Sequence, residues 1–66
     1  MNINELELRT QLRRLSREYV IELEKVKILY DYVGDIYRCE DYCILLEEGE
    51  SWKTILKSLK QYYKGG

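Results

Sequence analysis

The sequence predicts an all-α protein, with a long N-terminal helix followed by two short helices in a helical hairpin or three-helix bundle. Three observations support this fold class. Proline is absent, and the four glycines stand at positions 34, 49, 65 and 66. Leu, Ile, Glu, Lys and Arg, which suit helices, dominate the composition. Apolar residues recur at helical spacing. We expect one small domain covering residues 1–66.

The first helix is expected over about residues 5–33. Apolar side chains at positions 8, 12, 15, 19, 23, 26, 30 and 33 advance by about 3.6 residues per step, the α-helical period. Asn4 is a favourable N-cap with Glu7 as its capping-box partner, and Gly34 is typical of a helix C-terminus.

Two short helices follow, over about residues 36–47 and 52–63. Asp35 and Ser51 are the expected N-caps, and Gly49 separates the two helices. The apolar face of the second helix comprises Ile36, Cys39, Tyr42, Cys43 and Leu46. The third helix places Trp52, Ile55, Leu56 and Leu59 on one face and lysines on the other.

The lengths of these helices predict a homodimer. The short helices are each about 18 Å long, too short to cover the whole first helix. An apolar stripe left in water is an association surface, and small chains often gain stability by oligomerising. We therefore expect the first helix to pair with a second copy, unless the third helix covers the stripe. The predicted dimer interface comprises Leu8, Leu12, Leu15 and Tyr19.

The C-terminal half contains the pattern of a helix, a turn "EGES" and a helix start "WKTILKSL". This segment resembles phage transcriptional regulators with a sigma-factor region-4-like helix-turn-helix domain. The residues that carry the resemblance are Tyr42, Leu45, Gly49, Ser51, Trp52, Ile55 and Leu59. Such a domain needs a further recognition helix in the major groove, and "KQYYKGG" is too short to form one. The segment is either the relic of such a domain or simply the third helix of a bundle.

Charge is unevenly distributed along the chain. Residues 31–50 carry seven acidic side chains and one basic side chain, whereas residues 51–66 carry four lysines and no acid. The acidic middle could steer the protein to a basic partner, or simply be a solvated face. Nucleic acid is a secondary expectation, because the net charge of −1 lacks a basic surplus. Its candidate contacts are Arg9, Arg13, Arg17, Lys53, Lys57, Lys60 and Lys64.

The chain is unusually rich in aromatic residues, with seven tyrosines and one tryptophan. Exposed Tyr, Trp and Arg are common anchors at protein interfaces, although some of these rings could pack against the first helix. With the acidic residues they define a candidate partner-binding set of Tyr32, Tyr37, Glu40, Asp41, Glu47, Glu48, Trp52, Tyr62 and Tyr63.

No pattern in the sequence indicates catalysis or a cofactor. Histidine is absent, as is a glycine-rich phosphate loop. Cys39 and Cys43 could supply half of a tetrahedral zinc site, but the chain has no third cysteine. We expect both to be small buried hydrophobic residues, and we expect neither a metal nor an enzyme activity.

We therefore expect a non-enzymatic protein-interaction module. The resemblance implies a phage or mobile-element accessory or inhibitor protein, which binds and blocks a host macromolecule of defence or transcription. The alternatives are a DNA- or RNA-binding regulator with a truncated helix-turn-helix, and a purely structural oligomer. No segment has a secretory signal or the apolar length of a membrane span, so a cytoplasmic location, in the host if phage-encoded, is expected.

Overall fold

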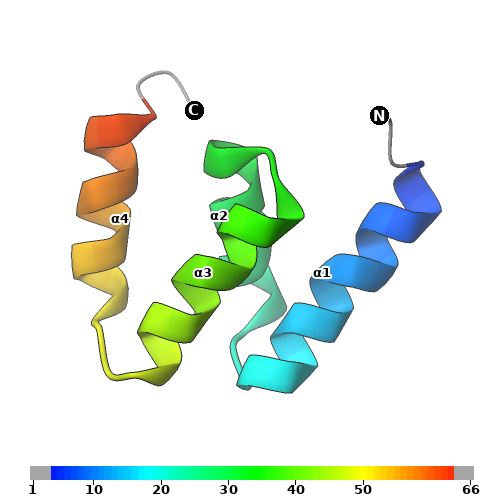
Figure 1. Ribbon diagram of the computed structural model, residues 1–66, viewed down its shortest axis with the longest axis horizontal. Coiled ribbons are helices and arrows are strands. Elements are labelled where there is room, and N and C mark those ends of the chain that lie inside the picture. Colours follow the sequence, from blue (N-terminus) through cyan, green and yellow to red (C-terminus); the bar gives the residue numbers. More distant parts are fainter. Residues whose placement is uncertain (1–3, 64–66) are drawn as a thin grey trace.

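The computed structural model describes residues 4–63, which form four α-helices and no β-strand. Helix α1 spans Glu5–Tyr19, α2 Leu23–Val33, α3 Ile36–Glu47 and α4 Trp52–Tyr62. Helices α2 and α3 lie in the middle, while α1 and α4 flank them on opposite sides (Figure 1). No helix within residues 4–63 is both long enough and apolar enough to cross a membrane. The all-α prediction is confirmed, but the prediction of three helices is wrong.

The single helix predicted over 5–33 is broken at residues 20–22. Val20 adopts the left-handed conformation, with φ 53° and ψ 57°, and its N–H donates to the carbonyl of Ser16. The Ile21 N–H donates to the same carbonyl at 3.0 Å, and the Ser16 hydroxyl donates to the Ile21 carbonyl at 2.6 Å. These bonds close a helix-ending turn of the kind that usually employs glycine.

Val20 makes this turn costly for the backbone. A left-handed conformation costs an L-residue about 1–2 kcal/mol, and β-branched side chains are rarely found there. The Val20 side chain is 89% exposed, so its own packing does not offset that cost. The compensation lies elsewhere, because the bend folds α1 back onto α2 and α3 and buries Leu12 and Leu15. Helical periodicity could not reveal the bend, since it continues through residues 20–22 unchanged.

The predicted N-caps Asn4 of α1, Asp35 of α3 and Ser51 of α4 are confirmed. The side chain of Asn4 accepts the N–H of Glu7 at 2.8 Å, and that of Asp35 accepts the N–H of Tyr37 at 2.9 Å. Ser51 accepts the N–H of Thr54 at 3.1 Å and also donates to its hydroxyl. Gly34, with φ 65°, ends α2. Predicted bounds therefore agree with α3, and α4 differs by one residue.

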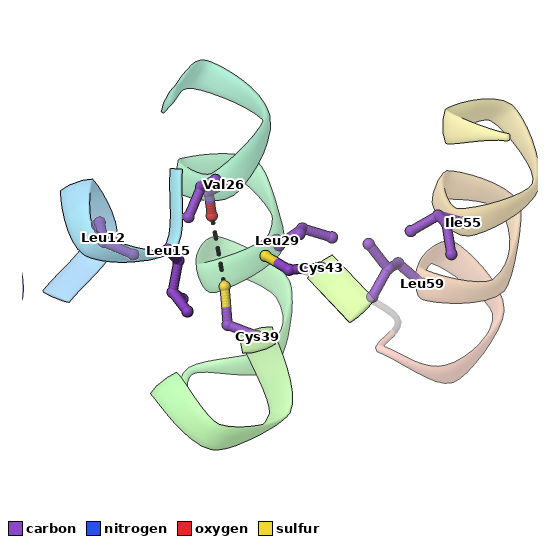
Figure 2. Close-up of a cluster of buried hydrophobic side chains, with 8 residues drawn as sticks. All are labelled: Leu12, Leu15, Val26, Leu29, Cys39, Cys43, Ile55 and Leu59. Atoms are coloured by element: carbon purple, nitrogen blue, oxygen red, sulfur yellow. Dashed lines mark hydrogen bonds between the residues drawn. The ribbon is translucent and has the colours of Figure 1, made fainter. Parts of the chain in front are cut away.

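Eight buried side chains form one core that draws on all four helices (Figure 2). The two cysteines of α3 lie among leucine, isoleucine and valine side chains, and the Cys39 thiol donates to the carbonyl of Val26 at 3.7 Å. Their expected role as small buried hydrophobic residues is confirmed. The core comprises Leu12, Leu15, Val26, Leu29, Cys39, Cys43, Ile55 and Leu59.

The apolar stripe that predicted a dimer is covered within one chain. Leu12 and Leu15 are buried, and Leu8 and Tyr19 are half-buried against the core. The chain covers them because α1 turns back at Val20 instead of extending beyond its neighbours. The homodimer stays a prediction, but an uncovered leucine stripe no longer supports it.

We expect Leu15→Ala to destabilise the protein severely. Emptying this fully buried position costs about 2–5 kcal/mol. A chain of 66 residues has a total stability of about 3–10 kcal/mol. Leu6→Ala is the control, because Leu6 is 74% exposed and its loss should cost less than about 0.5 kcal/mol. Urea unfolding followed by circular dichroism measures both, and equal effects would contradict the placement of α1.

Candidate functional site

The largest cluster of predicted contact residues lies on the outer side of α3 and at the end of α4. A groove of about 320 Å³ opens there, which we call the α3–α4 groove. It combines two tyrosine rings, one leucine and a pair of opposite charges. Its lining residues are Arg38, Asp41, Tyr42, Leu45 and Tyr63.

The exposed face of α3 extends the α3–α4 groove outward. Tyr37 is 81% exposed, and Ile44 and Leu45 are each more than one-third exposed. Residues 37, 41, 44 and 45 share one face because they are spaced at one and two helical turns. The opposite face of the same helix buries the two cysteines. Helix α3 thus presents an aromatic and aliphatic surface to solvent while its other side holds the core.

A polar contact joins α3 to the C-cap of α4 at the α3–α4 groove. An Arg38 guanidinium nitrogen lies 3.4 Å from the Tyr63 hydroxyl, to which it donates. Burial raises the pKa of Tyr42, the nearby Tyr63 adds to this, and Arg38 acts in the opposite direction. The raised pKa of Tyr42 therefore favours the protonated hydroxyl, which interacts with Tyr63 at this groove.

The structure brings together some of the predicted partner-binding residues and separates others. Asp41 and Tyr63 line the α3–α4 groove, Tyr37 lies exposed one helical turn before Asp41, and Tyr62 lies exposed one residue before Tyr63. Glu48 is exposed beyond the C-terminus of α3. Three other residues of the predicted partner-binding set lie away from the α3–α4 groove. Tyr32 packs half-buried against the core, Trp52 lies half-buried with the Lys25 ammonium 5.5 Å from its ring, and Glu47 faces the α1–α2 turn.

Glu40, which is predicted to contact a partner, also makes contacts within the chain. It accepts a hydrogen bond of 2.7 Å from the Tyr19 hydroxyl and lies 3.7 Å from the Arg14 guanidinium. Arg14 also pairs with Glu18 at 2.9 Å and donates to Gln11 at 3.0 Å. This network ties α1 to α3 at the half-buried edge of the core.

A second groove, basic in character, lies between α1 and α2. It has a volume of about 200 Å³, and we call it the α1–α2 groove. Arg9, Arg13 and Lys27 surround a floor of Leu12 and Leu23. Within residues 4–63, ion pairs are formed by Arg14 and by none of these three cations. In an unbroken helix Arg9 and Lys27 would lie about 27 Å apart, so the bend at Val20 creates this basic groove.

The two predicted rows of basic residues do not form one surface. Arg17 continues the arginine row along exposed α1. Lys53, Lys57 and Lys60 are exposed on α4, on the opposite flank of the molecule (Figure 1). Helices α1 and α4 make no contact with each other. Lys64, the fourth predicted lysine, lies outside the described residues.

Cys39 and Cys43 lie in the apolar core, where their role is structural. Both thiols are buried, and proximity to Cys43 together with burial raises the pKa of Cys39. The raised pKa disfavours the Cys39 thiolate, the form that binds metals and acts as a nucleophile, whereas the hydrogen bond with Cys39 lowers the pKa of Cys43. Over residues 4–63 the structure forms no group of three or more His, Cys, Asp or Glu residues placed to hold a metal ion.

Several residues that line the two grooves were not among the contacts predicted from the sequence. Arg38 and Leu45 line the α3–α4 groove, and Lys27 lines the α1–α2 groove. The helical wheel of residues 36–47 would have placed Arg38 and Leu45 beside Asp41. No local signal could have paired Lys27 with Arg9, because their proximity depends on the bend.

The segment that resembles a helix-turn-helix forms the second half of α3, the turn at residues 48–51, and α4. Gly49 has φ 110° in this turn, and Ile55 and Leu59 are buried. Comparisons with protein-family models, with curated proteins and with solved structures find no match to this chain.

We expect Tyr19→Phe to remove a pH-dependent part of the stability. The hydrogen bond to Glu40, burial and the surrounding carboxylates raise the pKa of Tyr19 from 10.0 to about 12. The folded state therefore favours the protonated phenol. Its contribution is complete below pH 10 and is lost as pH rises through about 12. The difference in unfolding free energy between wild type and Tyr19→Phe should shrink over that window in urea titrations.

Glu40→Gln is the matched variant, because it keeps an acceptor but removes the charge. It should move the Tyr19 titration, followed by tyrosinate absorbance, back towards pH 10. A difference between wild type and Tyr19→Phe that is the same at neutral and strongly alkaline pH would contradict the role of this hydrogen bond.

Proposed function

We propose that the chain is a non-enzymatic protein-interaction module, whose contact surface is the exposed face of α3 and the adjoining α3–α4 groove. Tyr37 carries the proposal. It projects a large aromatic side chain into solvent with 81% exposure, one helical turn before Asp41, which lines a groove that a partner side chain could fill. Binding there would mask a surface of the partner, as expected for an inhibitor or accessory protein.

The composition of the surface supports a protein partner. Tyrosine and arginine are enriched among residues that dominate binding energy, and such anchors usually border a pocket. Four such side chains lie at the α3–α4 groove or on the adjoining face of α3: Arg38, Tyr42 and Tyr63 line the groove, and Tyr37 is exposed on α3. Ile44 and Leu45 add aliphatic area beside them. A single exposed hydrophobic residue needs no explanation, but this grouping on one face favours an interface.

The charges of the surface favour a partner with a basic rim around an apolar centre. Asp41 belongs to the α3–α4 groove, and Glu48 and Glu50 are exposed where the chain leaves α3. Charge complementarity of this type accelerates encounter and selects the partner. Arg38 donates to the Tyr63 hydroxyl and keeps its positive charge within the groove, so the acidic edge of the surface lies where the chain leaves α3.

Site-specific photocrosslinking tests this proposal in cells. A photoreactive phenylalanine analogue replaces Tyr37 in one variant and Thr10, exposed on α1, in the control. We expect a light-dependent adduct of defined mass with a protein partner from position 37 and none from position 10. Adducts at both positions, or at neither, would contradict the proposed surface.

Alanine substitution at position 37 measures how much this side chain contributes to the binding free energy. Tyr37→Ala should weaken binding of the crosslinked partner by about 30-fold, the effect of a hot-spot residue. Its melting temperature should change little, because the side chain is exposed and outside the core. Lys57→Ala, on the exposed face of α4, is the matched control and should leave the affinity unchanged.

A second candidate function is contact with nucleic acid through the α1–α2 groove. Arg9, Arg13 and Lys27 converge there without an ion-pair partner among residues 4–63, and Arg17 continues the row. Guanidinium groups bind phosphate oxygens with two parallel hydrogen bonds, so this arrangement suits a phosphate backbone. The proposal uses α1 and α2 alone, because the lysines of α4 lie on the other flank.

The salt dependence of binding tests this second candidate. Contacts with three or four phosphates should give a slope of about −3 in a plot of log affinity against log salt concentration. Arg13→Gln should reduce that slope by about one unit, whereas Lys57→Gln on α4 should not change it. Duplex and single-stranded probes are both used. Absence of binding at low salt, or equal effects of the two variants, would exclude this groove as the contact.

A further inference from the structure

The turn at residues 20–22 has the features of a hinge between two conformations. Val20 is the one non-glycine residue with positive φ in residues 4–63, and its β-branched side chain disfavours that conformation. Helix α2 is also the one helix of the four that begins without a side-chain N-cap bond. The bend therefore leaves both a disfavoured backbone and uncapped N–H groups.

A straight helix through the same residues would relieve both defects. No glycine or proline occurs between residues 5 and 33, and Leu15, Tyr19, Leu23 and Val26 keep helical spacing across the hinge. In the straight form, the N–H groups of Leu23 and Glu24 would find carbonyl partners four residues earlier. The bonds lost would be those that join Ser16 to Ile21.

Straightening would carry α1 away from its own core. Leu12 and Leu15 would lose their contacts with α2 and α3, and the surface beneath them would be uncovered. A second straightened copy offers the matching surfaces, since its α1 fits the same site. The Tyr19 and Arg14 contacts with Glu40 would then form between chains with unchanged chemistry. Exchange of an identical element is a low-cost route to a dimer.

We propose that this protein forms a domain-swapped homodimer, in which residues 20–22 straighten and α1 of each copy packs on α2 and α3 of the other. The surface covered by α1 is thus a binding site for the α1 helix of a second copy. Each α1–α2 groove would then combine Arg9 and Arg13 of one chain with Lys27 of the other. The dimer would also present two copies of the α3 face. The inference stands independently of the proposed protein and nucleic-acid contacts.

Two variants should shift this equilibrium in opposite directions. Val20→Gly favours the bend and disfavours the straight helix. Because a dimer has two hinges, its dissociation constant should rise by about 100-fold or more. Ser16→Ala removes the hydroxyl bond to Ile21, which exists only in the bent form. It should lower the dissociation constant by about tenfold. Sedimentation equilibrium over a wide range of protein concentration measures both, and circular dichroism verifies that each variant stays helical.

Isotope-filtered NMR identifies the mode of pairing. In a dimer mixed from labelled and unlabelled chains, contacts between Leu15 and Val26 should appear between molecules. The proposal is overturned if Ser16→Ala remains monomeric at the highest concentration, or if these contacts stay within one molecule. It is also overturned if Val20→Gly leaves the dissociation constant unchanged.

Discussion

The reversal of the chain at residues 20–22 is the constraint on which the rest of the structure depends. The N–H groups of Val20 and Ile21 donate to the Ser16 carbonyl, and the Ser16 hydroxyl donates to the Ile21 carbonyl. These bonds turn α1 back along α2. The turn is unfavourable for Val20 considered alone. It is maintained because it brings Leu12 and Leu15 into the core, where burial of each leucine contributes about 1.5–3 kcal/mol. Local strain is thus offset by tertiary packing.

Helix α3 has two distinct roles because its faces differ. Its inner face carries two cysteines, whose small side chains permit close approach to α2, as the contact between the Cys39 thiol and the Val26 carbonyl shows. At its half-buried edge, Glu40 joins Tyr19 and Arg14 of α1. Its outer face carries Tyr37, Ile44 and Leu45. A scaffold anchored on one face can hold a contact surface rigid on the other.

The two grooves differ in how far they depend on the tertiary structure. The α3–α4 groove is built largely from one helix, and Asp41 and Tyr63 of the predicted contact set line it, with Tyr37 one helical turn before Asp41. Those residues were recognisable as aromatic and charged side chains outside the apolar stripe. The α1–α2 groove unites Arg9 with Lys27 across the bend. Residues so far apart along a helix become neighbours only when the chain reverses.

The sequence by itself determined the helical class, the caps at Asn4, Asp35 and Ser51, the stop at Gly34 and the bounds of α3. These features depend on side chains that act within one helical turn. The tertiary structure alone decided that residues 5–33 form two helices and that Leu8, Leu12, Leu15 and Tyr19 pack within one chain. The same helical spacing serves a straight helix and a bent pair. The choice between them depends on the apolar side chains that each form buries, and the free energy of that burial comes from contacts with residues distant in sequence.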